Sequence, residues 1–247
     1  MKTMANLLRQ ILSIRGQIPR ITTRQIHLNV MVGLGLVLLI FSAQPSQASK
    51  TLTHEQLLAQ LHKGGVVIYF RHGLTDWSQT DTLPLQFKAC ETQRNLNSEG
   101  RVQMKAIGKA MTTLAVPVGA VLSSPYCRTV ESAKLAFGRA DADSRLSYVG
   151  PLTGQARKDQ VDRLGKLLGT PPPKGKNTVL IAHRGNLLEA TQVDLEEGEA
   201  ALFLPVGSGH QMIGRLTRKD WESLAAKNIF LEPTEEECRE PNRLPSG

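Results

Sequence analysis

Val66-Val67-Ile68-Tyr69-Phe70-Arg71-His72-Gly73 is the stretch that decides the fold of this 247-residue chain. A second stretch of the same kind follows later, Val179-Leu180-Ile181-Ala182-His183-Arg184-Gly185. In each, a continuous apolar run ends at a basic turn that contains glycine, which is typical of a buried parallel strand. Because parallel sheets bind ligands at the carboxyl ends of their strands, we expect the two histidines to share one crevice.

Helices and strands alternate on both sides of these stretches. Thr53 and Gln56 form a capping box that opens a helix through about His62, and Gly64-Gly65 ends that helix. The chain closes with a hairpin turn at 206–209. We expect further helices from 97 or 98 to near 117 and at about 126–137, 157–168 and 186–191, and strands at about 66–70, 120–122, 144–149, 178–182, 200–205 and 211–216.

This order of elements predicts an α/β fold with three α/β/α layers, in which a mainly parallel sheet carries an antiparallel hairpin at one edge. The length and the 40% hydrophobic content suit a single domain, which we place at residues 49–232. The acidic, proline-rich tail at 233–247 is expected to be loose. Residues 74–97 are polar and aperiodic, which predicts a long loop after the first strand.

The first 48 residues have the layout of a secretory signal peptide. A basic, acid-free stretch precedes an apolar run at 30–41, and small residues follow at Ser46-Gln47-Ala48. The run is shorter than the roughly 20 apolar residues of a transmembrane helix. We therefore predict cleavage after Ala48 and an exported, periplasmic or secreted protein. The alternative is an uncleaved N-terminal anchor, which is the only membrane contact that we expect.

The basic excess of the chain lies mostly in that leader. The formal net charge is +8, but the residues after position 48 carry 25 bases against 22 acids. Aromatic residues make up 4% of the chain, and no stretch interleaves them with bases. Nucleic-acid binding is therefore not expected.

Three strand ends each present a group that can bind an anion. Arg71 and His72 follow the first strand, Arg128 lies one turn into the helix after the second, and His183 follows the strand at 178–182. Arginines offer planar forks of N–H donors that match phosphoryl oxygens. A neutral imidazole beside a bound phosphoryl group can attack phosphorus. The set suits phosphoryl transfer through a phosphohistidine.

These residues resemble the histidine phosphatase superfamily, which includes cofactor-dependent phosphoglycerate mutases and histidine acid phosphatases. The resemblance rests on Arg71-His72-Gly73, Ser123-Ser124-Pro125-Tyr126-Cys127-Arg128 and His183, and it spans about residues 64–217. The segment Cys90-Glu91-Thr92-Gln93-Arg94-Asn95-Leu96, continuing through Gly100 to Gln103, also resembles exported bacterial members of the phosphatase branch. It implies an exported phosphomonoesterase whose ligand is a small phosphorylated substrate or inorganic phosphate, with no cofactor and no metal ion.

The resemblance implies a role for each residue that matches the family pattern. His72 would be the nucleophile that becomes phosphorylated. Arg71 and Arg128 would clamp the phosphoryl oxygens, and His183 would stabilise the transition state. Electrostatic stabilisation of this kind is usually the largest catalytic contribution.

Three more residues belong to the expected substrate-binding set. Gly73 follows the nucleophile directly. Thr75 either bonds the phosphate or caps the turn, and Arg94 either lines the pocket or forms a surface ion pair. The sequence leaves both alternatives open.

The sequence departs from the family pattern at the proton donor. Arg184 follows the second histidine, where histidine acid phosphatases often have an aspartate, and 146–154 contains no carboxylate, where phosphoglycerate mutases supply a glutamate. We take Glu199, beside the hairpin strand, as the first candidate donor, with Asp76 and Glu131 as alternatives. The missing donor keeps open a catalytically weak or inactive phospholigand-binding protein and, less favoured, a phosphomutase.

The chain has three cysteines, Cys90, Cys127 and Cys238, which allow one disulfide. We predict a bridge between Cys90 and Cys127, because they lie next to the pocket candidates Arg94 and Arg128 and because export permits oxidation. The bridge would tie the long loop to the rim of the crevice. It would contribute roughly 2 to 4 kcal/mol to stability.

Overall fold

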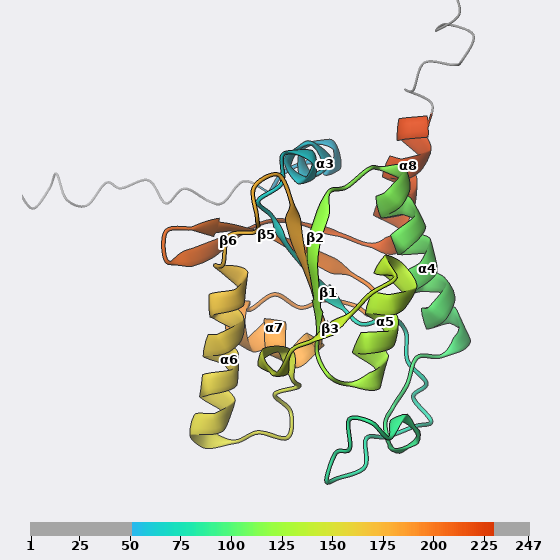
Figure 1. The fold of residues 1–247 in the computed structure, drawn as a ribbon, viewed down its shortest axis with the longest axis vertical. Coiled ribbons are helices and arrows are strands. Elements are labelled where there is room, and N and C mark those ends of the chain that lie inside the picture. Colours follow the sequence, from blue (N-terminus) through green and yellow to red (C-terminus); the bar gives the residue numbers. More distant parts are fainter. Residues whose placement is uncertain (1–50, 230–247) are drawn as a thin grey trace, which may run out of the picture. The chain divides into compact units, whose positions relative to one another are not determined.

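A six-stranded mixed sheet lies at the centre of this computed structural model, which describes residues 51–229 (Figure 1). The strand order is β3-β2-β4-β1-β5-β6. Strands β3, β2, β4 and β1 run parallel to one another, whereas β5 is antiparallel to both β1 and β6. The strands are β1 (Val67–Arg71), β2 (Val118–Ser123), β3 (Asp141–Ala142), β4 (Asn177–Ala182), β5 (Ala200–Val206) and β6 (Gly209–Leu216).

Helices cover both faces of this sheet, which confirms the predicted three-layer fold with its antiparallel edge hairpin. Residues of α3, α4, α5 and α8 join the core on one face, and residues of α6 and α7 join the core on the other (Figure 1). The helices are α3 (His54–Lys63), α4 (Ser98–Thr113), α5 (Cys127–Phe137), α6 (Gly154–Leu168), α7 (Arg184–Thr191) and α8 (Arg218–Ile229), with short 3-10 turns η2 (Cys90–Thr92) and η3 (Ser144–Leu146).

The central strand β1 supplies both cores because its side chains alternate between the two faces. Ile68 and Phe70 pack in the core under α3, α4, α5 and α8, whereas Val67 and Tyr69 pack under α6 and α7. Every residue of the strand is buried. A strand buried on both faces has to be apolar throughout until it reaches the edge of the sheet, and the first polar residue there is Arg71.

The capping box predicted at the start of α3 is present: the Thr53 hydroxyl accepts from the Gln56 N–H, and the Gln56 side chain accepts from the Thr53 N–H. Gly64, with φ of 79°, ends the helix. This left-handed conformation favours glycine.

Two elements differ from the sequence prediction. The prediction of an extended piece at 144–149 is wrong. The strand in this region is the two-residue β3, which ends at Ala142. The turn η3 follows, because the Asp143 carboxylate accepts from the Arg145 N–H. Helix α8 was not predicted. It buries Trp221 against Phe70, and Thr217 and Asp220 cap its start by exchanging hydrogen bonds.

The described residues all lie in one compact unit. Within residues 51–229, no helix has the length and apolar character needed to cross a membrane. The leader at 1–48 and the tail at 233–247 lie outside the described residues, and so do the predicted domain boundaries.

Candidate active site

The ends of β1 and β4 bring the two histidines together. The strands are parallel neighbours, and Arg71 at the end of β1 pairs with Ala182 at the end of β4. His72 and His183 follow directly, so their rings lie edge to face with centroids 5.7 Å apart. Arg128 arrives from α5, which follows β2 on the other side of β4. The predicted crevice therefore exists.

These four side chains are buried and line one small cavity of about 200 Å³. Loop residues and the start of α7 complete its wall. The lining consists of Arg71, His72, Trp77, Asp81, Arg94, Arg128, Tyr148, His183, Arg184 and Gly185.

His72 is held as a neutral imidazole with one free nitrogen. Its Nδ1 lies 2.9 Å from the Gly73 carbonyl oxygen, which can only accept, so the proton of the neutral ring lies on Nδ1. Burial, together with the charge of Arg128, lowers the pKa of His72 well below its usual value. The Nε2 lone pair is therefore available as a nucleophile. Gly73 contributes its carbonyl, and a Cβ there would lie 2.8 Å from Cγ of Met104.

His183 is fixed by contacts on every side. Its Nε2 lies 2.8 Å from the Ser124 hydroxyl, and its ring packs against Tyr126 and Tyr148 at 4.7 and 5.1 Å between centroids. The Tyr69 hydroxyl donates to the backbone carbonyl of His183 and accepts from its N–H. Burial and the Arg128 charge lower the pKa of His183 well below its usual value as well.

Three arginines in the wall of the cavity each keep a buried nitrogen without a hydrogen-bond partner: Nε of Arg71, Nε of Arg128 and Nη1 of Arg94. An unpaired buried donor is costly, and more so when it carries charge. Arg71 is otherwise engaged by the Leu195 carbonyl at 3.0 Å and by Glu197 at 3.3 Å. The three free donors make this cavity suitable for an anion.

Thr75 and Arg94, whose roles the sequence left open, lie in different places relative to the cavity. Arg94 lines the cavity, and its guanidinium stacks over the ring of Trp77 at 4.0 Å from the centroid. Thr75 is buried but is not part of the cavity wall. Its hydroxyl donates to Glu197 over 2.7 Å.

The structure places Glu199, the first candidate proton donor, outside the small cavity. Its carboxylate accepts from Nε and Nη2 of Arg215, both over 2.8 Å, and from the Glu196 N–H, and it does not line the cavity. The alternatives Asp76 and Glu131 also lie outside this cavity. Asp76 accepts from Ser78 and Gln79, and Glu131 accepts from Arg101.

Glu197 is a buried carboxylate beside His72, and sequence reasoning missed it. Its Oε1 lies 3.3 Å from Arg71 Nη2 and 3.9 Å from Nδ1 of His72. It therefore lies on the Nδ1 side of the ring, away from the free Nε2. The available signal was the hairpin itself: β5 pairs with β1, so the acidic turn before β5 lies beside the end of β1.

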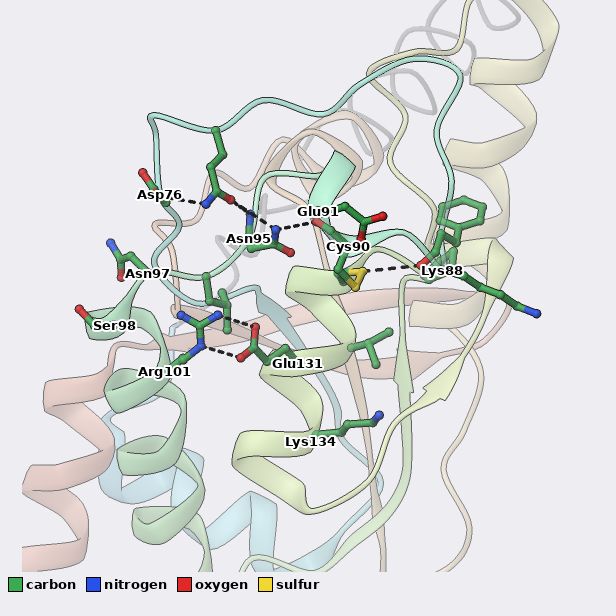
Figure 2. A pocket seen from close by; sticks show the side chains of 16 residues that line it. Asp76, Lys88, Cys90, Glu91, Asn95, Asn97, Ser98, Arg101, Glu131 and Lys134 are labelled. Atoms are coloured by element: carbon green, nitrogen blue, oxygen red, sulfur yellow. Dashed lines mark hydrogen bonds and ion pairs between the residues drawn. A yellow bond between two sulfur atoms is a disulfide. The ribbon is translucent and has the colours of Figure 1, made fainter.

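The predicted bridge between Cys90 and Cys127 is present, with an S–S distance of 2.01 Å. It ties the long loop to the first residue of α5, next to Arg128. Figure 2 shows it in the wall of a second, larger cavity of about 990 Å³, beside the Arg101–Glu131 ion pair. Neither histidine lines that cavity.

The sequence model of the histidine phosphatase superfamily (branch 1) matches residues 67–163, from β1 into α6. This segment of the chain is similar in sequence to the histidine phosphatase superfamily. The match includes Arg71, His72 and Arg128. His183 lies beyond it, and the sheet brings His183 to the same cavity.

Individual relatives are distant in sequence. An acid phosphatase of Mycobacterium tuberculosis is 29% identical over 175 residues, which are 68% of this chain and 82% of that protein. Among solved structures, a putative alpha-ribazole-5'-P phosphatase from Escherichia coli K-12 aligns with a TM-score of 0.47 and 13% identity, over 63% of this chain and 98% of that chain. The protein histidine phosphatase SixA complexed with tungstate aligns with a TM-score of 0.43 and 14% identity, over the same shares.

Proposed function

We propose that this chain hydrolyses small phosphomonoesters through a phosphohistidine on His72. One observation carries the proposal: a neutral imidazole with a free Nε2 shares a cavity with three unpartnered guanidinium nitrogens. A nucleophile beside a ready anion site is what phosphoryl transfer requires. The match of residues 67–163 to the histidine phosphatase family model and the similarity to an acid phosphatase support the same reaction class.

The first half of the reaction phosphorylates the enzyme. The guanidinium groups of Arg71, Arg94 and Arg128 bind the phosphoryl oxygens, and Nε2 of His72 attacks phosphorus in line with the ester oxygen. The Gly73 carbonyl oxygen accepts the hydrogen bond from Nδ1–H and so stabilises the positive charge that develops on the ring. His183 lies beside His72 and stabilises the negative charge that builds up on the oxygens. Water then attacks the phosphohistidine and releases phosphate.

The size of the cavity fits a phosphoryl group rather than a whole substrate. At about 200 Å³ it is smaller than the 300 to 1,000 Å³ of ordinary ligand pockets. The alcohol part of the substrate would lie at the mouth, where Trp77 is 70% exposed. A metabolite-wide screen for phosphate release would identify the substrate.

The decisive test of the activity compares the wild-type chain with His72→Ala on p-nitrophenyl phosphate. We expect the variant to lose at least about 100-fold in kcat/KM, because it removes the nucleophile. His54→Ala is the matched control, since His54 is half-exposed on α3 and lies outside the cavity. Equal rates in wild type and His72→Ala would overturn the proposal. Vanadate binding without any turnover in a broad screen would instead indicate a phospholigand-binding protein.

We also propose that the chain is exported and that its leader is removed after Ala48. The basic, acid-free leader and the disulfide support this. Expression of the full chain in a Gram-negative host should yield a periplasmic protein that begins at Ser49. A chain that keeps residues 1–48 and sediments with membranes would indicate the anchored alternative.

A further inference from the structure

Asp81 is the one acidic residue in the wall of the small cavity. It lies in the long loop between β1 and α4, and it shares the cavity with His72 and His183. None of the carboxylates considered from the sequence reaches this position, and Glu197 lies on the Nδ1 side of His72. The described part of the chain thus offers Asp81 as the acid next to the bound phosphoryl group.

Arg128 holds Asp81 in a way that leaves room for the phosphoryl group. Its terminal nitrogens Nη1 and Nη2 donate to the two oxygens of Asp81 over 2.9 and 3.2 Å. Its Nε is buried without a partner. A guanidinium presents two forks, Nη1 with Nη2 and Nε with Nη2. With Asp81 on the first fork and a phosphoryl oxygen on the second, the carboxyl and the phosphoryl group lie side by side.

The loop that carries Asp81 is firmly tied, so the carboxyl is placed in advance. The Arg94 N–H donates to Oδ1 of Asp81 over 2.9 Å, and the Thr82 N–H donates to the Thr92 carbonyl over 2.8 Å. Asn95 joins the two arms of the loop through Gln79 and the Cys90 carbonyl. Figure 2 shows Asn95 beside Cys90, whose disulfide links the loop to α5.

We propose that Asp81 is the proton donor to the leaving oxygen, an assignment that rests on the proposed phosphatase function. The monoanionic phosphomonoester brings in the proton, and the Asp81 carboxyl relays this proton to the ester oxygen. When Nε2 of His72 forms its bond to phosphorus, the bond to the ester oxygen breaks. The ester oxygen keeps the electron pair and takes the Asp81 proton, so that the alcohol leaves neutral.

The second half of the reaction restores the starting state. The Asp81 carboxylate accepts a proton from water while the water oxygen attacks phosphorus. The N–P bond breaks, and its electron pair returns to Nε2 of His72. Phosphate leaves, and the proton held by Asp81 departs to solvent or with the product.

The test is the dependence of kcat/KM on the leaving group, because kcat/KM reports the step that phosphorylates the enzyme. We expect Asp81→Asn to lose at least about 100-fold on phenyl phosphate, whose leaving group needs a proton. On p-nitrophenyl phosphate, whose leaving group is stable as an anion, we expect a loss of less than about 10-fold. Asp81→Glu should restore part of the rate on phenyl phosphate.

Asp76→Asn is the matched control, since Asp76 lies in the same loop but outside this cavity. It should leave the ratio of the two rates unchanged. An equal loss on both substrates in Asp81→Asn would overturn the proposal and make Asp81 a residue that only positions Arg128. Circular dichroism separates this outcome from misfolding, because a folded Asp81→Asn keeps the wild-type spectrum. If Asp81→Asn is misfolded, Asp81→Glu replaces it and is judged by the same ratio of the two rates. The proposed function is tested separately: it fails if His72→Ala hydrolyses p-nitrophenyl phosphate as fast as the wild type.

Discussion

Two buried neutral histidines make the stability of the fold depend on pH. The pKa values of His72 and His183 are lowered in the folded state by burial and by Arg128, whereas an unfolded histidine titrates near 6.5. Below about pH 6.5 the unfolded chain therefore binds two protons that the folded chain does not bind. Stability that is present above this pH is lost as the pH falls, by about 1.4 kcal/mol per pH unit for each histidine.

Urea unfolding at pH 7.5 and pH 5.0 checks this expectation. The wild-type chain should lose more free energy of unfolding between the two pH values than the double variant His72→Asn, His183→Asn, which has no imidazole to titrate at the site. An identical loss in both proteins would show that the two histidines titrate normally in the fold.

Individual residues of the small cavity were predictable only where they follow a recognisable strand. Arg71, His72 and His183 stand directly after apolar runs, and the sheet placed them as expected. Glu197 and Glu199 stand two residues apart in one acidic turn, and only the folded turn shows that Glu199 pairs with Arg215. Asp81 had no signal at all, because it lies in an aperiodic loop whose path depends on tertiary contacts.

At the scale of the elements, the disulfide and the long loop act together. The bridge closes a sequence separation of 37 residues, and a loop of this size corresponds to about 3 to 4 kcal/mol of stability in the chain-entropy relation. We expect the double variant Cys90→Ala, Cys127→Ala to lose a similar amount in urea unfolding. We also expect a lower rate on p-nitrophenyl phosphate, because the loop carries Arg94 and Asp81 into the site. Full stability and activity without the bridge would contradict this.

Helix α4 packs against α5 at Gly108, where a larger side chain would clash with the backbone of α5. A Cβ on Gly108 would lie 2.1 Å from the Ala136 carbonyl oxygen, so Gly108→Ala should destabilise the fold by about 1 to 3 kcal/mol. Gly165 in α6 is the matched control, because a Cβ there would meet nothing within 4 Å. Gly165→Ala should raise stability by up to about 1 kcal/mol, since alanine is the better helix former. Thermal unfolding of both variants tests the crossing, and a stabilising Gly108→Ala would refute it.

Most elements could be predicted because local signals and burial agree. The apolar strands, the capping box at Thr53 and the hairpin at 206–209 are examples. Helix α8, which was not predicted, carries a comparable capping signal in Thr217 and Asp220. The two-residue strand β3 has no pattern of its own, because only pairing with β2 makes it a strand.

For the whole molecule, the sheet order explains how distant residues come to one site. β1 lies between β4 and β5, and β2 lies beyond β4, so the ends of the parallel strands and the turn before β5 meet at one edge. The sequence predicted the mainly parallel sheet, its antiparallel hairpin and a crevice shared by the two histidines. The strand order comes from the structure. The small cavity and its unpartnered arginine nitrogens emerged only from the packed structure.

The proposed reaction requires that His72 becomes phosphorylated during turnover. Rapid acid-free quenching of the wild-type chain with p-nitrophenyl phosphate, followed by intact-mass and peptide mass spectrometry, tests this directly. We predict one phosphoryl group on the peptide that contains His72, labile to acid and absent from His72→Asn. Turnover without any phosphoenzyme, or phosphorylation at another residue that persists in His72→Asn, would contradict the account.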